Sequence, residues 1–156
     1  MPAIAYHITW TTYGSWLPGD ERGWVQSGLP GIQAADAMLA EATRQRLAEA
    51  VVVLSPAQRE IVEATIRDVC TTRGWTLHAV NPRSNHVHVV VTAEATPETV
   101  MSQLKAWCSR QLSDHAGLVG STRNGRRRWW TEHGSTKYIF DEGYLHNAIR
   151  YVNERQ

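Results

Sequence analysis

The sequence predicts an α+β fold in which helices pack on one face of an antiparallel sheet. Three observations lead to this class. Apolar and polar residues alternate from Ala3 to Thr11, as in a half-buried strand. Two apolar stretches, residues 75–80 and 86–91, flank the turn sequence NPRSN, as in an antiparallel hairpin. Segments with helical periodicity lie between these strands and after them.

The length and composition suit one domain. The chain has 156 residues, of which 42% are hydrophobic, enough for one core, so we expect a single domain over residues 1–156. No apolar run approaches the roughly 18 residues of a membrane helix, and no secretion signal opens the chain, so we expect a cytoplasmic protein. Cys70 and Cys108 lack metal-ligand spacing, which predicts buried thiols.

The segment after the first strand is unusual. Residues 13–35 are rich in Gly and Pro, which predicts a long ordered loop. A helix is expected from Ala37 to Val51, with Asp36 as its N-cap. Loops of this length in a compact domain are usually functional or disordered, and Trp16 and Trp24 argue against disorder.

The next helix is specified by its ends. Ser55 is a good N-cap, Pro56 suits the first helical position, Gln58 completes a capping box, and Gly74 ends the helix. Its predicted buried stripe consists of Val62, Ile66, Val69 and Cys70.

Three elements are expected in the C-terminal part. Thr96 and Pro97 open a helix that ends near Ser113, and the Gly- and Arg-rich residues 117–135 are expected to form a loop. Residues 136–140 predict a fourth strand. Residues 141–156 predict a last helix whose apolar stripe is Leu145, Ala148, Ile149 and Val152. The resulting order indicates a ferredoxin-like arrangement.

Two histidines in the second hairpin strand are candidates for metal ligands. Residues at i and i+2 of a strand share a face, so His86 and His88 point to one side and the intervening valines to the other. A simple hairpin would place His78 opposite His88, and His7 is a candidate for the same face. The alternative is a polar sheet surface that happens to be rich in histidine.

Tyr151 lies at the edge of the last helix's buried stripe or outside it. At roughly 100° per residue it is about 160° from Ile149 and about 100° from Val152. This position indicates a side chain presented to a ligand, although an ordinary surface tyrosine would also fit.

Charge is distributed unevenly along the chain. Residues 1–103 hold 7 Lys and Arg against 10 Asp and Glu, whereas residues 104–156 hold 9 against 5. The basic C-terminal third is a hint of a polyanionic partner. The segment RNGRRRWW could neutralise phosphates and stack on an unpaired base. The candidate DNA contacts are Arg123, Arg126, Arg127, Arg128 and Trp129, with Lys105, Arg110, Lys137 and Arg150 as further backbone contacts.

These motifs together resemble the HUH single-tyrosine transposases, including their REP-associated relatives. The resemblance is borne by the segments YHITWTTYGSWLPGDERGWV, GWTLHAVNPRSNHVHVVV and WWTEHGSTKYIF and by the terminal AIRYVNERQ, so it covers nearly the whole chain. It implies an enzyme that cleaves and rejoins single-stranded DNA, often beside a hairpin. It also implies a homodimer that associates with the nucleoid when bound to DNA.

The resemblance assigns roles to particular residues. Tyr151 matches the nucleophile, which would form a 5′-phosphotyrosine and release a 3′-hydroxyl. His86 and His88 match the two histidine ligands of a Mg²⁺ or Mn²⁺ ion. The alternative function is a non-catalytic, domesticated module that binds hairpins or single strands.

The third metal ligand departs from the simplest family pattern, in which Gln or Asn follows the tyrosine by four residues. That position is Arg155, which cannot coordinate a cation. Glu154 shares a helix side with Tyr151, whereas Gln156 has the ligand type of the family. Both remain provisional, with His78 as an outside candidate.

Overall fold

The computed structural model describes residues 2–14, 24–25, 32–33, 52–117 and 128–154. The strands and helices follow one another along the chain as β1 (Ala5–Thr12), β2 (Trp24–Val25), β3 (Ile32–Gln33), α2 (Pro56–Arg73), β4 (Thr76–Pro82), β5 (His86–Thr92), α3 (Pro97–His115), β6 (Trp130–Ile139) and α4 (Glu142–Glu154).

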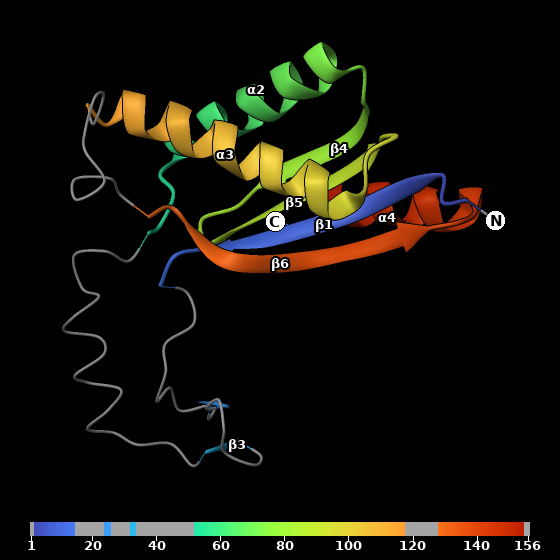
Figure 1. The fold of residues 1–156 in the computed structure, drawn as a ribbon, viewed down its shortest axis with the longest axis horizontal. Helices are drawn as coiled ribbons and strands as arrows, with labels where there is room; N and C mark the ends of the chain where they lie inside the picture. The colour runs from blue at the N-terminus through green and yellow to red at the C-terminus, as the bar shows by residue number, and fades with distance from the viewer. Residues whose placement is uncertain (1, 15–23, 26–31, 34–51, 118–127, 155–156) are drawn as a thin grey trace.

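The main sheet is antiparallel and has the strand order β4-β5-β1-β6. The N-terminal strand therefore lies between β5 and β6, and β4 and β6 are the edge strands of this sheet (Figure 1). A separate antiparallel pair, β2 and β3, lies within the segment expected to be a loop. The α+β class with an antiparallel sheet is confirmed.

Helix α2 begins and ends as the sequence predicts. The Ser55 side chain accepts a hydrogen bond from the Gln58 backbone N–H at 3.1 Å, and Gln58 Oε1 accepts one from the Ser55 N–H at 2.9 Å. This reciprocal pair satisfies two N–H groups that a helix start would otherwise leave unpaired. Gly74 ends the helix in the left-handed region, with φ 76°, where a side chain would be strained.

The face of the sheet beneath α2 and α3 holds the larger hydrophobic core. Ile8, Trp10, Val87, Val89 and Val91 point into it and are at most 1% exposed. Helix α2 contributes its predicted stripe, and Cys70 and Cys108 are buried in this core as expected. Trp107 of α3, whose helical spacing also predicted a core position, is exposed instead. Burial raises the pKa of Cys70 to about 11, so this thiol stays protonated at neutral pH.

Helix α4 packs on the opposite face of the sheet. Its stripe residues Leu145, Ala148 and Val152 bury themselves against Ala79 and Val90. The prediction that the helices lie on one face is therefore wrong for α4, which lies behind the sheet in Figure 1. Helical periodicity identifies which residues a helix buries, but it does not identify the face of the sheet that receives them.

Several boundaries differ from the prediction. Strand β6 begins at Trp130, six residues before the expected strand at 136, because Trp130 is buried in the core and pairs with Thr12 of β1. The expected helix over residues 37–51 lies outside the described residues. Among the described helices, none is both long and apolar enough to cross a membrane.

Candidate active site

Strand β5 places His86 and His88 on the face that α4 partly covers. The valines between and after them, Val87 and Val89, are fully buried beneath α2 and α3. Because strand residues alternate between faces, this burial fixes both imidazoles on the other side. The two ring centroids are 4.8 Å apart, with the rings nearly perpendicular at 88°.

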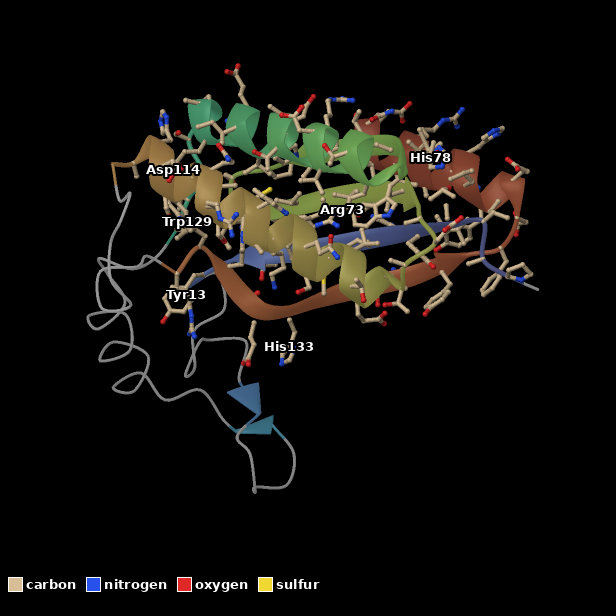
Figure 2. The ribbon with its side chains drawn as sticks, turned by 45° about the horizontal axis from the view of Figure 1, so that its top comes forward. Tyr13, Arg73, His78, Asp114, Trp129 and His133 are labelled. Carbon is tan, nitrogen blue, oxygen red and sulfur yellow. The ribbon has the colours of Figure 1, made fainter. Side chains whose placement is uncertain are left out.

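The register of the hairpin differs from the prediction. Asn81, not His78, lies opposite His88, because β4 runs on to Pro82 and a register shift falls between Leu77 and Ala79. His78 Nε2 lies 2.7 Å from the Thr92 hydroxyl, at the far end of this strand pair. Figure 2 shows His78 and Trp129 toward opposite ends of the molecule. The prediction that His78 lies beside His86 and His88 is therefore wrong.

His7 joins the pair, as the sequence suggested. Its Nε2 lies 3.3 Å from His88 Nδ1, and the Thr9 hydroxyl lies 3.1 Å from the same nitrogen. Thr9 and His88 are direct cross-strand partners, so the β1–β5 register creates this contact. The His88 ring is held at Nδ1 from two sides, and its Nε2 has no hydrogen-bond partner among the described residues.

The hairpin turn orients His86. The Asn85 carbonyl accepts hydrogen bonds from the Thr12 backbone N–H at 2.9 Å and from the Thr12 hydroxyl at 3.3 Å, which ties the turn to the end of β1. The Asn85 side-chain Oδ1 lies 2.7 Å from His86 Nδ1. Since an amide oxygen only accepts, His86 Nδ1 carries the proton and its Nε2 keeps a lone pair.

The pKa values of the three histidines are all lowered. The pKa of His88 is lowered to about 4, mainly by burial and also by the neighbouring His86, His7 and Arg83. Burial is also the main cause for His86 and His7, with contributions from the charges of Arg83 and Lys137 respectively. At neutral pH the cluster is uncharged, which is the form of imidazole that coordinates a cation.

Tyr151 stands over this cluster from the last turns of α4. Its ring centroid is 5.7 Å from that of His88 and 6.0 Å from that of His7. The side chain is 44% exposed, which confirms that it lies outside the buried stripe of the helix. The fold thus joins a strand and a helix that are far apart in the sequence.

Asn81 ties the tyrosine helix to the histidine strand pair. Its Nδ2 donates to the carbonyl of Val152 at 2.8 Å, and its Cα is paired with that of His88. Asn81 therefore links the helical turn that contains Tyr151 to the cross-strand pair that contains His88. The sequence prediction missed Asn81 because the assumed register placed it in the turn.

The structure does not complete a third ligand position within the described residues. Glu154 Oε1 lies 3.8 Å from Arg150 Nε, and both side chains are more than 70% exposed. Gln156 lies outside the described residues. Over the described parts of the chain, no three His, Cys, Asp or Glu side chains are grouped so that they could hold a metal ion.

The predicted stacking residue Trp129 is in the core. It is 3% exposed, and its indole N–H donates to the Ser113 hydroxyl at 2.9 Å, so it is not available to an unpaired base. Trp130 is also buried and donates to the Lys105 carbonyl. The sequence could not separate core from surface here because adjacent tryptophans have no periodicity.

The predicted basic contacts fall into two groups. Lys105 is half-buried and donates to the carbonyls of Thr131 and Glu132, which makes it a structural contact more than a surface cation. Among the predicted contacts, Arg110, Arg128, Lys137 and Arg150 are exposed. Arg128 packs over the ring of Tyr13, which is labelled in Figure 2. Arg123, Arg126 and Arg127 lie outside the described residues.

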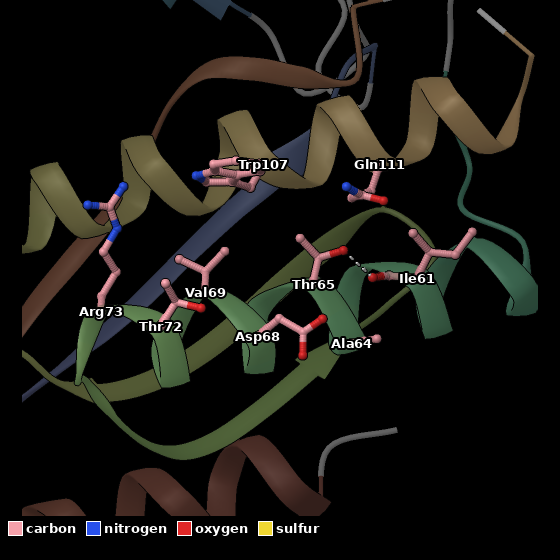
Figure 3. A pocket seen from close by; sticks show the side chains of 9 residues that line it. All are labelled: Ile61, Ala64, Thr65, Asp68, Val69, Thr72, Arg73, Trp107 and Gln111. Atoms are coloured by element: carbon pink, nitrogen blue, oxygen red, sulfur yellow. Dashed lines mark hydrogen bonds between the residues drawn. The ribbon is translucent and has the colours of Figure 1, made fainter. Parts of the chain in front are cut away.

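A groove of about 480 Å³ lies between α2 and α3 (Figure 3). These helices cover the face of the sheet opposite to α4, so the groove does not contribute to the histidine and tyrosine cluster. Its walls are formed by Ile61, Ala64, Thr65, Asp68, Val69, Thr72, Arg73, Trp107 and Gln111.

Comparison with known proteins finds a family match and similar solved structures. Residues 47–155 match the family described as "Transposase IS200 like". A putative transposase from Deinococcus radiodurans R1 is 14% identical, with a TM-score of 0.48 over 98% of this chain and 91% of that one. A REP-associated tyrosine transposase solved with a REP hairpin is 12% identical, with a TM-score of 0.52 over 97% of this chain.

The chain spans 66% of the length of that hairpin-bound transposase. No curated protein matches the sequence. At these identities the structural likeness shows the fold alone, whereas the family match covers more than two thirds of the chain. This chain therefore belongs to the IS200-like transposase family.

Proposed function

We propose that this transposase is a metal-dependent HUH single-tyrosine enzyme that cleaves and rejoins single-stranded DNA. The observation that supports it best is the position of Tyr151, whose ring centroid lies 5.7 Å from that of His88 although the two residues are 63 positions apart. A half-exposed tyrosine above neutral imidazoles is the arrangement that this chemistry needs.

Tyr151 serves as the nucleophile. Its phenolic oxygen forms a bond to phosphorus while the bond from phosphorus to the 3′-oxygen breaks. The tyrosine loses its proton, the departing oxygen gains one, and the 5′-phosphate becomes esterified to the protein. The phosphotyrosine ester retains the energy of the phosphodiester, so a 3′-hydroxyl can reverse the step without a nucleotide cofactor.

His86 and His88 would hold the cation through their Nε2 atoms. Both rings have their Nδ1 atoms engaged, by Asn85 in one case and by Thr9 and His7 in the other, which fits a pair of oriented ligands. A bound Mg²⁺ or Mn²⁺ would polarise a non-bridging phosphate oxygen. The third donor is proposed to be Gln156 or Glu154.

The substrate is proposed to be a single strand beside a hairpin. The similar structure that was solved with a REP hairpin supports this proposal, together with the partial exposure of His86. The predicted homodimer and the predicted association with the nucleoid belong to the same proposal.

The test is covalent capture. A labelled single-stranded oligonucleotide from the flank of the gene, incubated with Mn²⁺, is expected to become attached to the protein. Tyr151→Phe is expected to lose the product by about a thousandfold or more, because it keeps the ring and removes the attacking oxygen. Tyr144→Phe, which changes an exposed tyrosine on the same helix, is the matched control. Equal capture by Tyr151→Phe would show that another residue is the nucleophile.

A non-catalytic hairpin-binding module is the second candidate. The observation that favours it is the lack of a complete three-ligand group among the described residues. It predicts full hairpin affinity and no covalent product with Mg²⁺, Mn²⁺ or any other divalent cation. His86→Ala with His88→Ala would then leave hairpin affinity unchanged in a protein that forms no product, whereas in the enzyme it abolishes capture and spares much of the affinity.

A further inference from the structure

We propose that the DNA strand crosses the face of the sheet that bears the histidines, diagonally from Arg83 to Lys137. These two side chains bind phosphates on opposite sides of the phosphate that reacts. The inference rests on the proposed function and deepens it by assigning the path of the substrate. Arg83 was not among the residues that the sequence indicated.

Arg83 lies on the same face as the histidines because of the hairpin register. Asn81 pairs with His88 and Pro82 pairs with Val87, which ends the ladder, and extending the same alternation by one residue brings Arg83 opposite His86. The Arg83 backbone N–H donates to the His86 carbonyl at 2.7 Å, which confirms that pairing. Directly opposed residues of an antiparallel pair project their side chains to the same side, roughly 5 Å apart at Cβ.

The electrostatics agree with this placement. The positive charge of Arg83 contributes to lowering the pKa of both His86 and His88, so the guanidinium acts on both rings. The side chain is half-buried. A guanidinium has five N–H donors in a planar fork, so it can bind a phosphate while it keeps other contacts.

Lys137 lies at the other end of the proposed DNA path. It pairs with His7 across β1 and β6, and it is exposed on the edge strand. Its charge lowers the pKa of His7, which places it on the histidine face by a second route. An ammonium group on a flexible stem is a phosphate ligand without strict geometry.

The reacting position falls midway between the two cations. Arg83 lies in the row of His86 and Lys137 in the row of His7, four residues apart along β1, which is roughly 13 Å. The strands β4 and β6 are three strand spacings apart, or roughly 14 Å. The diagonal is therefore roughly 20 Å between Cα atoms, and its midpoint lies between β5 and β1 in the row of His88.

This midpoint is where Tyr151 stands over His88. A strand held at both ends of the diagonal would present an intermediate phosphate to the tyrosine and to the histidine pair. Charge at the two ends and neutral rings between them would favour a fixed register of the backbone on the protein, independent of base sequence.

The test maps each cation to a phosphate. Binding is measured with the Tyr151→Phe protein, so that no cleavage occurs, using the flank oligonucleotide with a single neutral methylphosphonate moved along it. A methylphosphonate at a phosphate that contacts a cation is expected to weaken binding. In Arg83→Met this weakening is expected to disappear at one phosphate, and in Lys137→Met at another, with the cleaved phosphate between them. Each is also expected to reduce the slope of log affinity against log salt by about 0.7.

Arg67→Met is the matched control, because Arg67 is an exposed arginine of α2 that pairs with Glu63 in the other layer. Arg83→Lys, which keeps the charge, is expected to retain the phosphate penalty and separates charge loss from misfolding. The path is wrong if both variants map to one side of the cleaved phosphate or to no phosphate. If the cations map apart but the parent protein never forms a covalent product, the path stands and the proposed strand transfer fails.

Discussion

The two faces of the four-stranded sheet use the same strands for different purposes. Toward α2 and α3, alternate residues such as Ile8, Val87 and Val89 are fully buried and apolar. Toward α4, the intervening positions of β1 are alanine, histidine and threonine, and one helix covers this face only in part. The first face provides most of the buried apolar surface, and the second keeps polar groups in a half-buried setting.

This division explains how neutral histidines are maintained on one face of the sheet. The buried valines hold the backbone of β5, so His86 and His88 leave the strand on the same face. Partial cover lowers their pKa values while leaving room for a substrate. Changes on one face should therefore alter stability, and changes on the other should alter chemistry.

The largest stability effect is expected on the valine face. Leu104→Ala removes a fully buried side chain between α3 and the sheet and should lower the free energy of unfolding by about 3 kcal/mol. Urea denaturation measures it, and the folded fraction should still form the covalent product. Val53→Ala, at a site that is 67% exposed, should change stability by less than about 0.5 kcal/mol. Similar values for both variants would contradict the proposed division.

An intermediate effect is expected from pH on the metal-free protein. His88 has a pKa of about 4 when folded and 6.5 as the ordinary value. Between these values the unfolded chain binds a proton that the folded one does not, so stability should fall as pH falls from 6.5 to 4, on the order of 2 kcal/mol. Above pH 6.5 this contribution should be constant.

His88→Asn isolates that contribution. Urea denaturation of the parent and the variant at pH 7.5 and pH 4.5 should show a smaller loss of stability in the variant. The remaining slope should come from other groups, including His86 and His7, whose pKa values are lowered in the same direction. An identical loss in both proteins would mean that His88 titrates normally.

The smallest free-energy effect is expected at Asn81, which links α4 to the strand pair that bears His88. Asn81→Ala removes the hydrogen bond to the Val152 carbonyl and should lower stability by about 1 kcal/mol. Because this bond anchors the turn that bears Tyr151, amide hydrogen exchange at the end of α4 should speed up and covalent capture should slow. Asn153→Ala, an exposed change in the same turn, should do neither. Normal exchange in Asn81→Ala would remove its positioning role.

Local features of the chain were sufficient to predict several elements. Helix α2 begins after the capping box at Ser55 and ends at Gly74, as expected, because caps act only on neighbouring backbone groups. The shared face of His86 and His88 follows from the period of a strand, and the exposure of Tyr151 follows from the period of a helix.

Features that depend on the relative placement of elements were not predictable in this way. The register shift near His78 moved that residue away from the site and brought Asn81 and Arg83 beside the histidines, because pairing depends on turn geometry and on the end of β1. Burial of Trp129 likewise depends on how β6 meets the core.

By itself, the sequence determined which residues share a strand face or a helix side, since the backbone periods of 2 and 3.6 operate within one element. Only the tertiary structure decided that α4 lies on the histidine face, and hence that Tyr151 meets His88 and His7. The physical reason is that an apolar stripe can be buried equally well against either face of a sheet, and the choice is made by shape and packing against small residues such as Ala79.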